Sequence, residues 1–420
     1  MTQMGRARFA VLAVLFVALA LLQSWATFRF FTSRYPGGND FYARWANGCA
    51  LVWSGENPYS EAATLQTQIG MYGRPARPGE DLAAFSYPLY ALFAFWPLCF
   101  IDSYPLVQAI WMTLMMYALL VGIVVAARVV EWRPPRWLWG LTLVWGVLNY
   151  PHARALILGQ MATLVFLVTA AALLFIKCGR DWAAGAVVAV ATIKPQMSFL
   201  LIPWILWWSA WQSRWRVWKG FGLAMGLLVG GSFLLVPTWL SEFLLGIRRY
   251  DVVSGTDYHS LTWIIACHFL DLSPVVKGIG VGAFSLLAAW TMWKGRRADW
   301  SGFLWSTGLI LILTNFIAPR TATTHYSMLV LPLFGWFSCV AERWKPRGTV
   351  LLVAVEASLL VGQWGLFLAS VDGSYETALV YLPFPISLLA LHVASRPGEA
   401  SMLTRWSDAI STSFGGWSRG

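Results

Sequence analysis

Apolar residues follow one another in long runs over almost the whole chain, and short polar segments separate the runs. A helix needs about 20 apolar residues to cross the hydrocarbon core of a bilayer, so each long run predicts a membrane-spanning helix. Several runs are shorter, and their flanking polar residues are expected to line a protein-walled cavity at membrane depth. The pattern predicts about twelve crossings, near residues 9–31, 105–128, 137–149, 161–177, 182–194, 196–211, 220–236, 274–293, 301–317, 327–341, 349–370 and 381–394.

Lysine and arginine residues gather in short clusters between the apolar runs, as they do in the cytoplasmic loops of membrane proteins. One arrangement of the spans places every cluster in the cytoplasm, with both chain termini on that side. The first run, from Phe9 to about Phe31, is too long for the apolar core of a signal peptide and is expected to be an uncleaved span. The clusters are Arg6/Arg8, Arg128/Arg133/Arg136, Lys177/Arg180, Arg214/Arg216/Lys219, Lys294/Arg296/Arg297 and Arg343/Lys345/Arg347.

The apolar run 85–101 does not fit as a crossing. Counting it as a crossing would place the basic clusters from Arg128 to Lys219 on the outside. The run starts with Phe85-Ser-Tyr-Pro88 and contains Pro97, which favours a re-entrant or surface-lying segment.

The expected organisation is an all-α, multi-pass protein of the cell membrane. One transmembrane module covers residues 1–394 and includes a long first external loop over 32–84. A polar cytoplasmic tail covers residues 395–420.

Composition excludes a soluble globular protein. Of the 420 residues, 58% are hydrophobic and only 12% are charged, whereas soluble domains carry about 25% charged residues. The basic clusters of a membrane protein explain the net charge of +11, so no nucleic-acid partner is expected. The scattered cysteines form no C-x-x-C pair and predict neither a zinc site nor a disulfide framework. All are interpreted as small packing residues: Cys49, Cys99, Cys178, Cys267 and Cys339.

Asp40 stands directly after the first span, in Gly37-Gly-Asn-Asp40. The glycines allow a sharp turn, and Asn39 is expected to cap the helix that follows. Asp40 is either a second capping residue, stabilised by the helix dipole, or a functional carboxylate at the membrane boundary.

The first external loop is predicted to contain two helices. Apolar residues recur at helical spacing after Asp40, which predicts an amphipathic helix lying on the outer membrane surface. Turn residues at Gly55-Glu-Asn-Pro-Tyr59 end it, and a second, polar helix over about 60–71 follows. The apolar face of the first helix carries Phe41, Trp45, Cys49 and Val52.

Two further polar groups interrupt apolar sequence on the expected outer side. Lys194 precedes Pro195 and therefore stands at a helix break, in a region where a lysine at the membrane centre costs about 2.5–3.5 kcal/mol. Lys194 either faces an outer cavity, where it suits an anionic phosphate, or extends to the outer headgroups. His325 opens the helix that follows the polar turn 318–326. It is either a satisfied packing residue or a functional group on the same face of the membrane as Asp40 and Lys194.

Other polar residues of the external segments complete the candidate set. Basic residues outside the membrane break the usual charge distribution, which either phosphate binding or simply a long external segment explains. The candidates for the donor phosphate or the cavity, beside Lys194 and His325, are Tyr87, His152, Arg154, Gln160 and Arg320. The candidates for the acceptor or the external loop are Arg248, Arg249, Asp257 and His259.

These residues together suggest group transfer from a phosphate-linked donor. A carboxylate can take the proton of an attacking hydroxyl, and cations can stabilise the charge on a leaving phosphate. Glycoside hydrolases need paired carboxylates because their leaving group must be protonated. One outstanding acid, Asp40, therefore favours a transferase.

Short motifs follow one another along the chain: Asp40-Phe-Tyr42, Gly55-Glu-Asn-Pro-Tyr59, Phe85-Ser-Tyr-Pro88, Leu158-Gly-Gln160, Ile193-Lys-Pro-Gln196 and His325-Tyr326. With this ordered set the chain resembles the GT-C superfamily of membrane glycosyltransferases. The family that it is most similar to is glycosyltransferase family 87, which includes polyprenol-phosphate-mannose-dependent α-mannosyltransferases. The resemblance covers almost the whole chain.

The resemblance implies a GT-C-type fold and an inverting transfer of a hexose, with mannose the expected sugar. The donor would be a polyprenyl-phosphate sugar and the acceptor a hydroxyl of a lipid-linked or glycan molecule, at the outer face of the membrane. By resemblance, Asp40 is the general base, Lys194 and His325 lie near the donor phosphate, and no metal or other cofactor is needed. The alternatives are a transporter or flippase for a lipid-linked sugar, which is expected to show repeated halves, and an acyltransferase-like or purely structural membrane protein.

Overall fold

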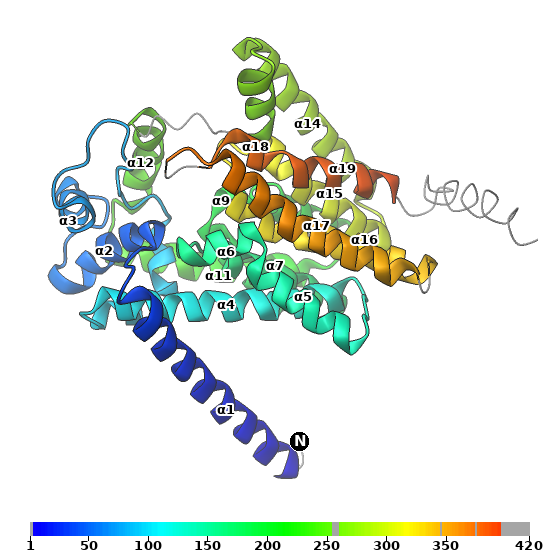
Figure 1. Ribbon diagram of the computed structural model, residues 1–420, viewed down its shortest axis with the longest axis horizontal. Helices are drawn as coiled ribbons and strands as arrows, with labels where there is room; N and C mark the ends of the chain where they lie inside the picture. The colour runs from blue at the N-terminus through cyan, green and yellow to red at the C-terminus, as the bar shows by residue number, and fades with distance from the viewer. Residues whose placement is uncertain (1–2, 254–259, 345–346, 374–375, 396–420) are drawn as a thin grey trace, which may run out of the picture. The chain divides into compact units, whose positions relative to one another are not determined.

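The computed structural model describes residues 3–253, 260–344, 347–373 and 376–395, and these residues are almost entirely helical, with no β-strand among them (Figure 1). The all-α prediction is confirmed, and a helix lies at each of the twelve predicted places. The count of twelve crossings is not confirmed. Among the described residues, seven helices are long and apolar enough to cross a membrane, or eight if the bent pair α6 and α7 is one span.

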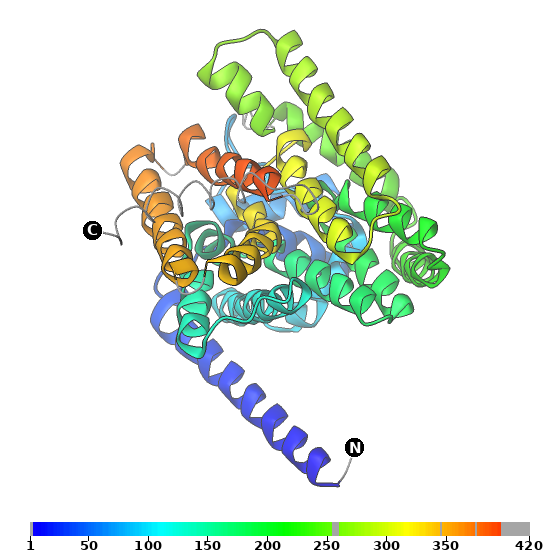
Figure 2. The same cartoon turned by 90° about the vertical axis from the view of Figure 1, so that its right-hand side faces the viewer.

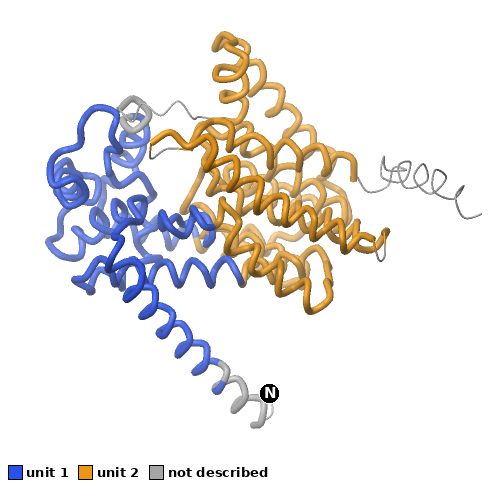
Figure 3. Tube along the Cα trace, viewed as in Figure 1, with its two compact units in different colours: residues 1–120, 153–164, 225–256 blue, residues 121–152, 165–224, 257–420 orange. Residues whose placement is uncertain are grey.

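The chain divides into two compact units, coloured separately in Figure 3. Unit 1 consists of residues 1–120, 153–164 and 225–256, and unit 2 of the remainder. The chain passes from one unit to the other within helices α4, α6, α7 and α11 and again after α12. The helices wholly or partly in unit 1 are α1 (Gln3–Thr27), η1 (Phe28–Thr32), α2 (Asn39–Ser54), α3 (Glu61–Tyr72), η2 (Leu89–Ala94), η3 (Trp96–Phe100), α4 (Tyr104–Val129), α6 (Tyr150–Ile157), the start of α7 (Ala162–Lys177), α11 (Trp215–Leu235) and α12 (Trp239–Val253).

Unit 2 contains the greater number of the apolar helices. Its helices are α5 (Arg136–Leu148), α7 (Ala162–Lys177), α8 (Asp181–Val190), η4 (Ala191–Ile193), α9 (Pro195–Ser198), α10 (Leu201–Trp211), α13 (Leu261–Trp263), η5 (Ile264–Phe269), α14 (Pro274–Gly295), α15 (Trp300–Ile317), η6 (Thr323–Leu329), α16 (Val330–Arg343), α17 (Arg347–Ser370), α18 (Ala378–Tyr381) and α19 (Pro383–Ala394).

Two kinds of membrane helix occur in unit 2. The apolar stretch of α15 is 67% buried, and that of η6 with α16 is 78% buried. The helix α15 packs against α14, α16 and α19 (Figure 2). In α14 and α17 only 11% and 17% is buried. A helix that is apolar on all sides avoids water, so it is buried either in the interior of a protein or in the lipid of a membrane. The exposed apolar surface of α14 and α17 therefore faces lipid, while α15 and α16 form the interior.

The sequence analysis predicted that the apolar face of α2 lies on lipid, and this prediction was wrong. Phe41, Trp45 and Cys49 on that face are buried, and α2 packs against α3, η2 and η3. Val52, near the end of the helix, is 37% exposed. The protein itself covers the face because the segment that follows α3 and its loop folds back onto it.

The folded-back segment is the run 85–101, which forms two short 3-10 helices, η2 and η3. Each has about the length of two turns, far less than a bilayer requires. This agrees with the prediction that the run is not a regular crossing.

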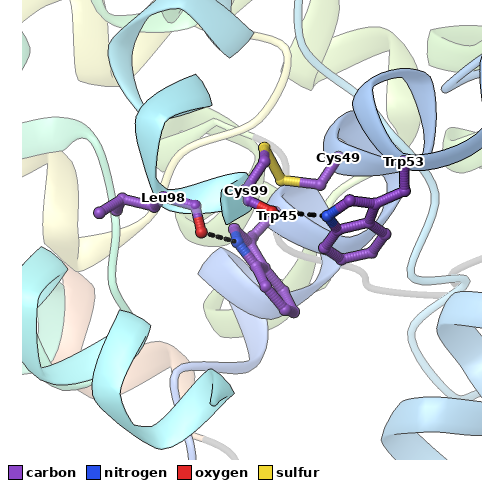
Figure 4. The surroundings of a disulfide bond; sticks show 5 residues. All are labelled: Trp45, Cys49, Trp53, Leu98 and Cys99. Atoms are coloured by element: carbon purple, nitrogen blue, oxygen red, sulfur yellow. Dashed lines mark hydrogen bonds between the residues drawn. A yellow bond between two sulfur atoms is a disulfide. The ribbon is translucent and has the colours of Figure 1, made fainter. Parts of the chain in front are cut away.

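The interpretation of all five cysteines as packing residues was wrong. Cys49 and Cys99 form a disulfide with a Cα–Cα distance of 5.3 Å (Figure 4). Beside it, the indole of Trp45 donates to the Leu98 carbonyl at 3.2 Å and that of Trp53 to the Cys99 carbonyl at 2.6 Å. The partners are 50 residues apart in sequence, so only the fold of η3 onto α2 brings them together.

Candidate active site

Asp40 is the second residue of α2, which begins directly after a turn of two glycines. Gly38 has φ +67°, a left-handed conformation that glycine adopts without strain. The hydroxyl of Tyr104 donates to the carbonyls of Gly37 and Gly38 at 2.9 and 3.1 Å, and Gln108 accepts from the Gly37 N–H at 3.2 Å. Two side chains of α4 thus fix the turn that sets the start of α2.

The predicted cap at Asn39 is not present. Gly38 occupies the N-cap position, and no side chain there caps the helix. The Phe41 N–H of the first turn instead donates to the carbonyl of Leu158 at 3.2 Å. The first turn leaves N–H groups without intrahelical partners, and here a distant backbone segment supplies the acceptor.

The segment that supplies it, Leu158–Gln160, is in close contact with α2. The carbonyl of Gly159 accepts from the indole of Trp111 at 2.8 Å, and the ring of Trp111 stacks on Phe41 at 4.6 Å. Gly159 has φ +69°, and a Cβ on it would lie 2.5 Å from the Cβ of Phe41. Only glycine therefore allows this approach, which brings Gln160 to the carboxylate of Asp40.

A small pocket lies at this point within unit 1. It is lined by Asp40, Phe41, Arg44, Tyr87, Gly159, Gln160 and Met161. The amide nitrogen of Gln160 donates to Asp40 Oδ2, and the Tyr87 hydroxyl donates to Gln160 Oε1 at 3.4 Å. The structure therefore brings together three of the predicted candidates, Asp40, Gln160 and Tyr87.

Arg44 belongs to this pocket, although the sequence analysis did not single it out. It is 8% exposed, donates to Ser86 Oγ at 3.2 Å and lies 5.2 Å from the ring centre of Tyr87. Burial raises the pKa of Tyr87 to about 12, with Arg44 opposing the shift and Asp40 adding to it. Arg44 stands four residues after Asp40, and residues four apart share a helix face. This spacing could have indicated that the two side chains lie together.

Lys194 lies in unit 2 at the predicted helix break, between η4 and α9. Its side chain is 2% exposed, so it does not extend to the surface as the headgroup alternative required. His325, also buried, lies in η6 within electrostatic range of Lys194. The structure therefore brings these two candidates together.

Glu376 is a buried acid of unit 2 that the sequence analysis did not identify. It is 4% exposed, and it accepts from the Tyr150 hydroxyl at 2.7 Å and from the Thr323 hydroxyl at 2.9 and 3.2 Å. Tyr150 is 226 residues away in sequence, so no local pattern could have revealed the contact.

The remaining candidates do not line the pocket of unit 1. His152 is buried, and its Nδ1 lies 2.6 Å from the carbonyl of Gly146 in α5. Arg154 and Arg320 are partly exposed, and Arg248 is exposed on α12. Arg249 is part of α12, but its side chain, Asp257 and His259 lie outside the described residues.

The fold and the pocket together define the class of this protein. It is an all-helical, multi-pass membrane protein with a carboxylate in a pocket lined by polar side chains. The model of glycosyltransferase family 87 matches residues 85–298, about half of the chain. The chain belongs to this family, which is of the GT-C type, and is a glycosyltransferase. No curated protein and no solved structure matches the chain. The match includes Tyr87, Gln160 and Lys194, while Asp40 and His325 lie outside it.

Proposed function

We propose that the protein transfers a hexose, with mannose the expected sugar, from a polyprenyl-phosphate donor to a hydroxyl of a lipid-linked or glycan acceptor. The observation that carries the proposal is the Asp40 carboxylate, partly exposed in a polar pocket of a family 87 chain. Membrane glycosyltransferases need a base that a lipid-borne substrate can reach, and Asp40 lies in the first turn of the helix after the first span.

In this reaction Asp40 takes the proton of the acceptor hydroxyl as its oxygen attacks the anomeric carbon. The bond from that carbon to the phosphate oxygen breaks, and the polyprenyl phosphate leaves with the bonding electrons. The attack from the opposite face inverts the anomeric configuration. A phosphate is stable as an anion, so the leaving group needs no acid and one carboxylate is sufficient.

The binding of the anionic phosphate is assigned to Lys194 and His325 on chemical grounds. A lysine ammonium is a compact cation that binds phosphate groups, and Lys194 lies within electrostatic range of His325. The absence of a metal requirement is part of the same proposal. Arg320, His152, Arg154 and the basic residues of α12 stay predictions for substrate contacts.

The proposed side of the membrane is extracytoplasmic, with both termini in the cytoplasm. The disulfide Cys49–Cys99 supports this, because disulfides persist in oxidising compartments. Cys178 follows Lys177 of a basic cluster and is exposed and free, so it serves as a marker for the other side. A membrane-impermeant maleimide is expected to label Cys178 in inside-out vesicles but not in intact cells. Labelling in intact cells would contradict the assignment.

The function is tested by incubating the purified protein with a panel of polyprenyl-phosphate sugars and a membrane extract, and identifying the product by mass. The wild type is expected to yield a product one hexose heavier than its acceptor. Asp40→Asn is expected to yield none while it elutes as a folded monodisperse protein. Full transfer by this variant would exclude Asp40 as the base, and counter-flow of labelled lipid without product would favour a flippase.

A further inference from the structure

Gln160 makes the one hydrogen bond that the carboxylate of Asp40 receives among the described residues. An ionised carboxylate only accepts hydrogen bonds, so the NH₂ end of the amide must face Asp40. The Oε1 end then faces the hydroxyl of Tyr87, which donates to it at 3.4 Å. The two neighbours thus fix the orientation of the amide, and the amide in turn holds one oxygen of the carboxylate.

The backbone around Gln160 restricts its position as well. The preceding residue, Gly159, contacts Phe41 so closely that no side chain fits, and its carbonyl is bound by Trp111. Leu158 accepts from the Phe41 N–H. Three successive residues are therefore bound to the first turn of α2 or to its neighbour. A chain segment held at this many points positions a side chain precisely, as an effective catalytic geometry requires.

We propose that Gln160 is a positioning residue for Asp40: it holds Oδ2 and leaves Oδ1 as the oxygen that receives the proton. This inference rests on the proposed function. An amide does not take up a proton at neutral pH, so the proton from the acceptor remains on Asp40 and no relay follows. The role differs from the ligand of the donor phosphate or cavity that the sequence suggested for Gln160.

Other titratable groups surround the carboxylate. Arg44 follows on the same helix and lines the pocket, Tyr87 lies beside Gln160, and Tyr104 of α4 is within electrostatic range of Asp40. Arg154 of α6 is not part of the pocket lining. Substituting Gln160 leaves all these groups in place, so a change in the titration of Asp40 reports the contact with the amide.

The first test measures the protonation of Asp40 without any substrate. A water-soluble carbodiimide with glycine ethyl ester labels protonated carboxyl groups, and peptide mass spectrometry quantifies the label on Asp40 as a function of pH. A hydrogen bond to the charged form lowers a pKa. In Gln160→Leu, which lacks this hydrogen bond, the labelling midpoint is expected to move to higher pH. An unchanged midpoint would overturn the proposal.

The second test uses Gln160→Glu and the pH profile of transfer from polyprenyl-phosphate mannose. Two adjacent carboxyl groups titrate as a pair. With one proton on the pair, the introduced carboxyl group donates to Asp40 as the amide does, and transfer is expected. Above the upper pKa of the pair the donor is lost, so activity is expected to fall about tenfold at high pH, where the wild type stays active. A uniform fall at all pH values would indicate a merely structural role.

Gln68→Leu is the matched control, because Gln68 is a buried glutamine of unit 1 that bonds Leu82 and Ala76 away from the pocket. It is expected to keep the wild-type labelling midpoint and pH profile. In Gln160→Leu, kcat is expected to fall about tenfold with KM nearly unchanged, whereas a substrate ligand would raise KM. If Asp40→Asn transfers fully, the proposed function fails; if only the Gln160 variants behave as wild type, the positioning role alone fails.

Discussion

Asp40 in unit 1 and Glu376 in unit 2 are two acids in very different surroundings. Asp40 is partly exposed and receives one hydrogen bond, from an amide, among the described residues. Glu376 is almost fully buried and accepts from two hydroxyl groups, those of Tyr150 and Thr323. A carboxylate that accepts from several donors connects the chain segments around it. A carboxylate with one donor and an open side can accept a proton from a substrate. Surroundings, and not residue type, thus distinguish a base from a structural acid.

Substitution of the two acids is expected to give the largest difference between the units. Asp40→Asn removes the proposed base and is expected to lower the transfer rate at least about a thousandfold with little effect on the unfolding temperature. Glu376→Gln keeps one acceptor oxygen and is expected to cost about 1–3 kcal/mol of stability with activity within about tenfold of wild type. Rates and thermal unfolding in detergent measure both. A thousandfold lower transfer rate in Glu376→Gln would contradict the interpretation of Glu376 as a structural acid.

Removal of the disulfide Cys49–Cys99 in unit 1 is expected to have the next largest effect, a lower free energy of unfolding. Replacing Cys49 and Cys99 together by serine releases α2 from η3 and is expected to cost about 2–4 kcal/mol in the free energy of unfolding. The matched control replaces the free, exposed Cys178 and Cys339 of unit 2, and no change is expected. Equal denaturation midpoints for the two double variants would show that the disulfide does not stabilise the unit.

Alanine substitutions at two glycines with a left-handed backbone distinguish the effect of a steric clash from that of backbone strain. Gly159 and Gly179 have φ +69° and +71°, but a Cβ meets Phe41 at 2.5 Å only at Gly159 and open space at Gly179. Alanine is expected to cost about 1 kcal/mol at Gly179 and about 2–3 kcal/mol at Gly159. Transfer should fall only in Gly159→Ala, because that change moves Gln160 away from Asp40. Equal losses of stability and activity would contradict the close approach.

The smallest expected effect concerns an ion pair in the loop that follows α3. Arg74 lies 2.7 Å from Glu80 and lowers the pKa of Glu80 to about 2. A lowered pKa stabilises the folded state above the unfolded value of about 4.5, and this contribution is lost as the pH falls towards 2. Both side chains are about one-third exposed, so the effect is small. The difference in unfolding temperature between wild type and Glu80→Gln should shrink between pH 5 and pH 3. A constant difference would exclude this explanation.

The positions of the helices could be predicted from the sequence because they depend on local patterns. Gly55 and Gly73, both with φ +69°, end helices α2 and α3. Lys194 interrupts the helical pattern before Pro195, and the structure has a break there. Arg44 follows the same local rule, four residues after Asp40, and could have been predicted with it.

The wrong predictions share a dependence on distant segments. Asn39 has the residue type of a cap, but Gly38 is the N-cap residue and the carbonyl of Leu158 accepts from the Phe41 N–H of the first turn. The face of α2 has the pattern of a surface helix, but η2 and η3 cover it. Apolar periodicity indicates that a face is buried and does not indicate whether protein or lipid buries it.

The sequence by itself determined that this protein is helical, lies in a membrane, and carries its unusual polar residues between apolar runs. These properties follow from residue type and spacing within a few helical turns. Only the tertiary structure decided that Cys49 joins Cys99, that Tyr150 binds Glu376, and that Gln160 holds Asp40. Such contacts depend on which segments pack together, and their energies are set by close approach and desolvation rather than by sequence separation.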